Sequence, residues 1–168
     1  MTKQIIAAIV ILAATCSATA QTAEWVKYSP SGKGFSILLP YTPKLEEDVR
    51  PSGHVIYRAI SGDRDVKDAA YLASYWDFSP SLTYSLDKLI ASDEGKVISE
   101  SNVSVGGYGG REIQLVKQAG GAEYKFRKRV YIVDQRVYML QYITPASADA
   151  VVVTRNGNKF FDSFSLGN

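Results

Sequence analysis

The sequence predicts an α+β fold with a single antiparallel β-sheet flanked by helices on both faces, an α/β/α sandwich. Most of the chain consists of segments in which apolar and polar residues alternate, and glycine, proline or aspartate turns separate them. Two further segments have the apolar spacing or the capping residue of a helix. With no internal repeat and no linker, these elements are expected to form one domain.

The first twenty residues have the pattern of a signal peptide. Lys3 supplies a positive charge, residues 5–14 form an uncharged apolar run, and the Ala-Thr-Ala at 18–20 has the small residues that signal peptidase accepts. We therefore expect a signal peptide over 1–20 and a mature domain over 21–168. The protein is then periplasmic or secreted.

Two other fates of the leader fit its residues less well. A lipoprotein would be modified at Cys16, but lipoprotein processing requires Gly, Ala or Ser before the cysteine, and Thr15 stands there. An uncleaved anchor needs about 20 apolar residues, and the run is shorter. Cleavage after Ala20 leaves no membrane span. It also removes the one cysteine of the chain, so no disulfide can form.

The charge balance argues against a protein that binds nucleic acid. The chain has 19 lysine and arginine residues against 17 aspartate and glutamate residues, a formal net charge of +2. Binding to a phosphate backbone depends on a strong positive field, which this balance does not supply. The basic run at 125–129 does not change this expectation, because strand alternation places Lys128 on the opposite face from its basic neighbours.

Eight segments have the composition of strands, and turn residues mark their ends. Pro40 and Pro43 stop the second strand. The glycines at 106–110, the pair at 120–121 and the Asp-Gln at 134–135 are predicted to form hairpin turns. The predicted strands are 25–28, 35–39, 54–60, 70–78, 97–105, 110–118, 122–133 and 136–143.

Two segments are predicted to be helical. The first begins at Pro80-Ser81, places the apolar residues of 82–90 in one stripe and stops at Gly95. Ser147 is expected to cap the second helix, which Asn156-Gly157 interrupts or weakens. The phenylalanines that follow are expected to dock on the sheet.

The two tightest turns set the register of the strands around them. If 120–121 is a two-residue hairpin, Ala119 faces Ala122 and paired residue numbers sum to 241; for 134–135 they sum to 269. Side chains then alternate between two faces. We expect one of these faces to be the core face that a helix covers, and it carries Ile113, Leu115, Phe126, Val130, Ile132, Val137, Met139 and Ile143.

The opposite face of these strands is mixed and aromatic. It is either a partner-binding surface or a surface that is partly covered. The same register places Glu112 opposite Arg129 and Gln114 opposite Arg127. Such cross-strand pairs also stabilise a sheet that has no binding partner. The candidate partner-binding residues are Arg127, Arg129, Tyr131, Tyr138 and Tyr142.

The sequence assembles no catalytic motif, so we expect a non-enzymatic protein with no cofactor and no metal. His54 is the one histidine, and no serine lies in a Gly-x-Ser-x-Gly motif. A zinc site needs three or four ligands, and the mature chain has no cysteine to supply them. Asp63, Asp65 and Asp68 lack the glycine of an EF-hand loop and are expected to be solvated charges.

Three groups of motifs lie along the mature chain. They are Trp25-x-x-Tyr28-Ser29-Pro30 with Gly34-Phe35-Ser36-Ile37-x-x-Pro40, Arg129-x-Tyr131 with Arg136-Val137-Tyr138, and Phe160-Phe161-Asp162-Ser163-Phe164. In this combination the chain resembles the PsbP-like superfamily of small envelope and lumenal domains. The resemblance implies an antiparallel sheet with helices on both faces. It also implies a non-catalytic adaptor or assembly role. No motif of this chain indicates that it shares the photosystem binding, metal binding or Ran binding of other members.

We therefore expect an exported accessory or adaptor protein that binds a protein partner in the cell envelope. The alternative is a small-molecule or lipid carrier with a pocket between the sheet and the helix at 82–90. Both hypotheses rest on an export signal joined to a domain with no recognisable catalytic centre.

Overall fold

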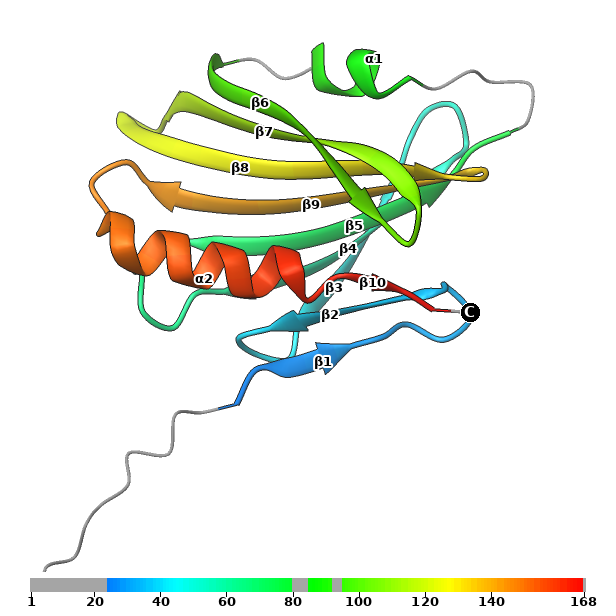
Figure 1. The fold of residues 1–168 in the computed structure, drawn as a ribbon, viewed down its shortest axis with the longest axis horizontal. Helices are drawn as coiled ribbons and strands as arrows, with labels where there is room; N and C mark the ends of the chain where they lie inside the picture. The colour runs from blue at the N-terminus through cyan, green and yellow to red at the C-terminus, as the bar shows by residue number, and fades with distance from the viewer. Residues whose placement is uncertain (1–23, 80–84, 92–94, 168) are drawn as a thin grey trace, which may run out of the picture.

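The computed structural model describes residues 24–79, 85–91 and 95–167 (Figure 1). The expected leader over 1–20 and the predicted helix start at 80–81 lie outside these residues. Neither helix of the described ranges is long and apolar enough to span a membrane. The elements are β1 (Val26–Tyr28), β2 (Phe35–Leu39), β3 (Lys44–Val49), β4 (Val55–Gly62), β5 (Ala70–Asp77), α1 (Leu86–Ala91), β6 (Lys96–Val105), β7 (Tyr108–Ala119), β8 (Ala122–Val133), β9 (Arg136–Pro145), α2 (Ala150–Asp162) and β10 (Ser165–Leu166).

Seven strands form one antiparallel sheet in the order β3-β4-β5-β9-β8-β7-β6. The predicted register is confirmed, because Ala119 lies opposite Ala122 and Val133 lies opposite Arg136. Both glycines of the 120–121 turn have positive φ, the backbone that a two-residue hairpin of this twist requires. The hairpin turns therefore determine the pairing of β7, β8 and β9.

The prediction of a single sheet is wrong, because β1, β2 and β10 form a second, three-stranded sheet in the order β1-β2-β10. Seven strands spaced about 4.8 Å apart present a face roughly 30 Å wide, whereas a helix is about 10 Å across. A single helix such as α2 therefore leaves much of the face uncovered. β2 covers the remainder by turning Phe35, Ile37 and Leu39 into the core. Figure 1 shows β1 and β2 beside α2, with β10 leading from the end of α2 to β2.

The main core lies between the large sheet and the layer formed by α2 and the small sheet, and it is mostly aromatic. Phe35 packs edge-on against Tyr75 and Tyr138, with ring centroids 5.4 and 5.3 Å away. Phe164, which follows α2, stacks on Tyr131 at 5.5 Å. Aromatic pairs at these separations stabilise beyond their buried area, so ring packing joins the two layers.

The face that we expected to be the core face carries a smaller apolar cluster. Trp76, Val130 and Val137 are buried there, and Leu86 and Leu89 of α1 pack against them. The larger core lies on the opposite, aromatic face. Alternation along the strands separated the two faces correctly, but it contains no information on which face receives the larger covering layer.

The helix boundaries differ from the predicted ones. α1 covers Leu86–Ala91, and Ser85 before it is not helical, whereas residues 80–84 lie outside the described residues. α2 is capped by Asp149 rather than Ser147, since the Asp149 carboxylate accepts hydrogen bonds from the backbone N–H groups of Val151 (2.8 Å) and Val152 (3.2 Å).

α2 is continuous across Asn156-Gly157, where the sequence predicted an interruption. Both residues are buried against the sheet. A Cβ on Gly157 would lie 3.2 Å from Cδ1 of Tyr142. Glycine therefore lets the helix approach the sheet closely, and this contact outweighs its low helix propensity.

β3 has no counterpart among the predicted strands. Its sequence, Lys-Leu-Glu-Glu-Asp-Val, has four charged residues in six positions. Charged residues are common on edge strands, where they discourage indiscriminate pairing with other chains. β3 is such a strand, because it pairs with β4 and forms one end of the large sheet.

A methyl group on Gly110 of β7 should destabilise the fold. A Cβ there would lie 2.5 Å from Cδ1 of Tyr131 and 2.6 Å from the carbonyl oxygen of Val130. We expect Gly110→Ala to lower the free energy of unfolding in urea by about 1–3 kcal/mol, the usual cost of overpacking. Gly109→Ala is the matched control, because a Cβ at Gly109 meets no atom within 4 Å. Equal losses in both variants would contradict this explanation.

Candidate functional site

The five candidate partner-binding residues lie on one face of the large sheet, and the structure covers that face. Arg127 is directly opposite Tyr142, and Tyr131 is directly opposite Tyr138. Tyr131 and Tyr142 are 2% exposed and Tyr138 is 4% exposed, because α2 and the small sheet lie over them. The tyrosines are therefore core residues, and the expectation that they offer a surface to a partner is corrected.

The two arginines of the set are partly exposed and fasten α2 to the sheet. Glu112 of β7 accepts hydrogen bonds from Arg127 at 2.9 and 3.0 Å and from Arg129 at 2.5 Å. On the helix side, Arg127 donates to Asn158 at 2.7 Å and Arg129 to Asp162 at 3.2 Å. Arg127 thus pairs diagonally with Glu112 and not with Gln114, the partner that the register suggested. A role of the arginines in partner binding stays a prediction.

The ring of Phe161 explains why both arginines turn towards α2. Their guanidinium carbons lie 4.7 Å (Arg127) and 5.1 Å (Arg129) from its centroid. Burial raises the pKa of the Glu112 carboxyl, but the hydrogen bonds and charges of the two arginines outweigh burial and hold that pKa below its usual value. The cluster is therefore ionised, and its two arginines are neutralised by Glu112 and Asp162 at the C-terminal end of α2.

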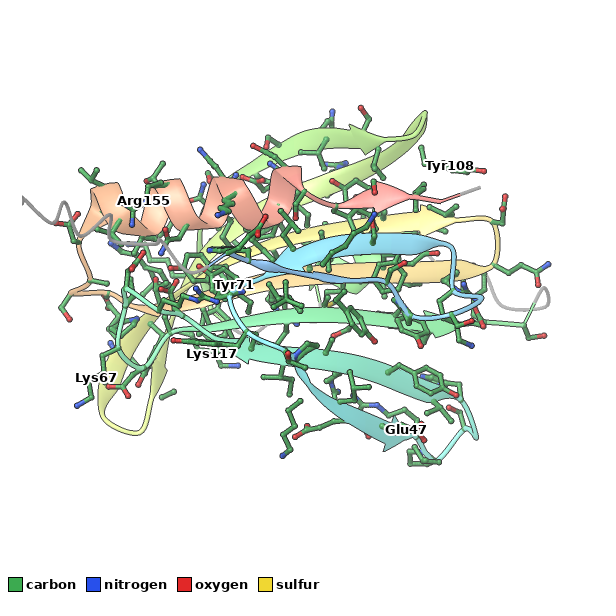
Figure 2. The ribbon with its side chains drawn as sticks, turned by 90° about the horizontal axis from the view of Figure 1, so that it is seen from below. Glu47, Lys67, Tyr71, Tyr108, Lys117 and Arg155 are labelled. Atoms are coloured by element: carbon green, nitrogen blue, oxygen red, sulfur yellow. The ribbon has the colours of Figure 1, made fainter. Side chains whose placement is uncertain are left out.

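Asp63 is not the solvated loop charge that the sequence predicted. Its carboxylate accepts hydrogen bonds from the hydroxyls of Tyr71 and Tyr142, the latter at 2.7 Å. The amide of Asn156 on α2 donates to both carboxylate oxygens, at 3.2 and 3.3 Å. The backbone N–H groups of Asp65 (2.7 Å) and Val66 (3.0 Å) complete the set. Figure 2 shows Tyr71 in the interior, between the sheet and the layer that covers it.

The sequence contained a weak signal for this carboxylate. An aspartate that bonds the backbone two and three residues later is a common turn former, and it can then point inward. Burial raises the pKa of Asp63, but the hydrogen bonds from Tyr71, Tyr142 and the two backbone amides lower it by more, so the net shift is downward. Burial and the bond to Asp63 raise the pKa of both tyrosine hydroxyls, which therefore stay protonated donors.

A polar cavity of about 560 Å³ opens beside this network. Each cationic side chain on its wall has a partner within the protein. Arg155 donates to Asp65 at 2.7 Å, Lys159 lies 4.7 Å from the ring centroid of Trp25, and Arg64 donates to a backbone carbonyl of the N-terminal segment at 3.1 Å. The lining residues are Glu24, Trp25, Asp63, Arg64, Asp65, Arg155, Asn156 and Lys159.

A second cavity, of about 280 Å³, lies between α2 and the large sheet. The carrier hypothesis placed a pocket between the sheet and the helix at 82–90, whereas this cavity uses the C-terminal helix. Its wall combines apolar and polar side chains with two basic ones. The lining residues are Ile98, Gln114, Leu115, Lys125, Phe126, Arg127, Tyr142, Thr144, Val153, Thr154 and Asn158.

His54 lies on the turn between β3 and β4, and its Nδ1 is 2.6 Å from the Oγ of Ser52. The nearby carboxylate of Asp48 is held by Arg58 at 2.7 Å and by Arg50 at 3.0 Å. The cavities described above are lined by other residues. In the described part of the chain, no group of three or more His, Cys, Asp or Glu residues is placed to hold a metal ion.

Solved structures are similar to this chain in fold. The solution structure of cyanobacterial PsbP (CyanoP) from Synechocystis sp. PCC 6803 superposes with a TM-score of 0.55 at 14% identity, over 88% of this chain and 95% of that one. The chain has a PsbP-like fold. A crystal structure from Bacteroides thetaiotaomicron VPI-5482 matches 88% of this chain with a TM-score of 0.52 at 14% identity, and this chain spans 49% of that protein's length.

The PsbP-like fold is what these comparisons establish. No family model matches the sequence, and neither does any curated protein. Identities of 14% carry no residue roles across, because the same fold hosts unrelated functions.

Loss of the Asp63 charge should destabilise the protein and flatten its response to acid. The carboxyls of Asp63 and Glu112 have lowered folded-state pKa values, so their stabilisation is complete above the unfolded value of about 4 and is lost as the pH falls through the folded value. We expect Asp63→Asn to lower the free energy of unfolding at neutral pH by about 1.5–3 kcal/mol, the value of a hydrogen bond to a charged group.

Urea denaturation at a series of pH values between neutral and acid checks this prediction. The stability of Asp63→Asn should fall less steeply below about pH 4 than that of the wild type. Glu47→Gln, which removes a carboxylate from the exposed strand β3, is the control and should behave like the wild type. Parallel acid profiles for Asp63→Asn and the wild type would contradict the assignment.

Proposed function

We propose that this protein is an exported, non-enzymatic accessory or adaptor protein that binds a protein partner in the cell envelope. The leader expected at 1–20 supports export. The observation that carries the adaptor function is a pair of exposed apolar side chains on the otherwise charged edge strand β3. Leu45 and Val49 of this strand are 63% and 68% exposed. Because they lie on the same face of an edge strand, these two side chains can contact alternate residues of an added strand.

The geometry of β3 suits pairing with another strand. Leu45 and Val49 are four residues apart and so lie on the same face. β3 pairs with β4 through six consecutive residues without a bulge, which keeps its outer edge regular. Figure 2 shows Glu47, which lies between the two apolar residues, at an edge of the molecule remote from Arg155 of α2.

The other end of the large sheet is a poorer candidate. β6 is also an edge strand, but its pairing with β7 shifts between Val97 and Ser99. Such irregularities twist an edge away from further pairing. We therefore assign the partner to β3. An extended segment of the partner would form main-chain hydrogen bonds with the outer edge and pack alternate apolar side chains on Leu45 and Val49.

Aspartate at the two apolar positions of β3 should weaken partner binding and leave the fold intact. A photo-crosslinking residue at Glu47 in the full chain, used on envelope fractions, reports the partner as a shifted band. We expect Leu45→Asp/Val49→Asp to reduce this band about tenfold or more, as loss of interface anchors does. Val151→Asp is the matched control, because Val151 is 78% exposed on α2, away from β3.

Two outcomes would contradict the adaptor function at β3. One is an unchanged crosslink in the double variant. The other is a crosslinked product that consists of two copies of this chain, because the edge would then serve self-association. Analytical ultracentrifugation of the purified protein separates that case from binding to a different protein.

The mature protein should begin at Gln21. Mass spectrometry of the N-terminal peptide of the protein isolated from cells checks this expectation, because cleavage after Ala20 leaves Gln21, free or cyclised to pyroglutamate, as the first residue. A lipid-modified Cys16 at the N-terminus would establish the lipoprotein alternative. A chain that still begins at Met1 would contradict cleavage altogether.

A small-molecule carrier is the second candidate function, and the cavity of about 280 Å³ between α2 and the sheet favours it. Its volume is near the lower end of ligand pockets. The cavity and β3 are separate, so binding of a ligand and binding of a partner can be tested independently.

A further inference from the structure

The cavity between α2 and the large sheet has an ordered wall on its sheet side. Gln114 of β7, Arg127 of β8 and Tyr142 of β9 form one row of directly paired residues. Lys125 and Thr144 form the next row. Because cross-strand partners project to the same face, both rows point towards α2.

The facing wall belongs to α2, and the rim belongs to the edge strand β6. Val153, Thr154 and Asn158 line the cavity from the helix. Ile98, which is 56% exposed, lines it from β6. The hydroxyl of Tyr142 is bonded to Asp63 at 2.7 Å, so this residue offers its ring to the cavity. An apolar tail can therefore pack among Val153, Ile98 and that ring.

The charges on the wall are positive. Lys125 and Arg127 line the cavity, and no acidic residue is among the lining residues. Arg127 is already neutralised by Glu112, at 2.9 and 3.0 Å. For Lys125, in contrast, the described residues supply no carboxylate within ion-pair distance. A ligand with an anionic head group would complement the charge of Lys125. The buried Thr144 is the cross-strand partner of Lys125.

The volume limits the size of the ligand. At about 30 Å³ for each non-hydrogen atom, which is the volume of a liquid water molecule, 280 Å³ holds roughly ten such atoms. That is a single short chain or ring with a small head group. A two-chain lipid does not fit within this volume.

We propose that this cavity binds a small monoanionic amphiphile, with the anionic head at Lys125 and the apolar tail between Tyr142 and Val153. This inference rests on the second candidate function, the carrier, and names its ligand class. It does not depend on partner binding at β3, which lies at the opposite end of the strand order from β6.

The test is isothermal titration calorimetry of the full mature chain with three probes of the same chain length: octanoate, octan-1-ol and octylamine. We expect octanoate to bind the wild type about tenfold more tightly than either other probe, as one charge-assisted contact allows. Lys125→Gln should weaken octanoate about tenfold and leave octan-1-ol unchanged. Methyl NMR signals of Ile98 and Val153 should shift on titration and report the location.

Val153→Trp fills the cavity and should abolish binding of every probe. Val151→Trp is its matched control on the exposed face of the same helix, and it should bind like the wild type. Equal binding of the three probes would overturn the anionic ligand class and leave the carrier function standing. Octanoate binding that survives Val153→Trp, or no binding of any probe to the wild type, would overturn both.

Discussion

The carboxylate of Asp63 is the interaction on which the arrangement of this fold depends. It lies between β4 and β5 and is bonded by Tyr71 of β5, Tyr142 of β9 and Asn156 of α2. A partly buried carboxylate is costly unless several donors surround it, so these segments must come together for the charge to be tolerated. The bond to Asn156 fixes how α2 lies along the sheet. Gly157, the next residue, then brings the helix close to the ring of Tyr142.

A second charged cluster holds the C-terminal part of α2 to the large sheet. Glu112 holds Arg127 and Arg129, which also bond to the helix. Between the two clusters the helix and the small sheet cover the aromatic face, so that face serves stability. The binding sites that we propose lie where this covering layer leaves the sheet accessible. They are the edge strand β3 and the cavity beside α2, where Lys125 is exposed.

Sequence reasoning succeeded where local chemistry decides the structure. The register of β7, β8 and β9 follows from two tight turns, because a two-residue hairpin permits one pairing. It failed where distant segments compete. β3 is charged and resembles a loop, and the second sheet depends on how wide a face the large sheet presents. The cavity beside α2 was not predicted, since the sequence does not show which helix lies over which strands.

By itself, the sequence determined the strands with clear alternation, their turns, their register and the separation of their two faces, because these follow from backbone sterics and neighbouring residues. Only the tertiary structure decided that the tyrosine face is the main core and that Asp63 is an interior acceptor instead of a solvated charge. Both outcomes depend on residues such as Asn156 and Phe161, which are far away in the chain, and on the total area that must be covered. Such non-local terms are absent from any single segment.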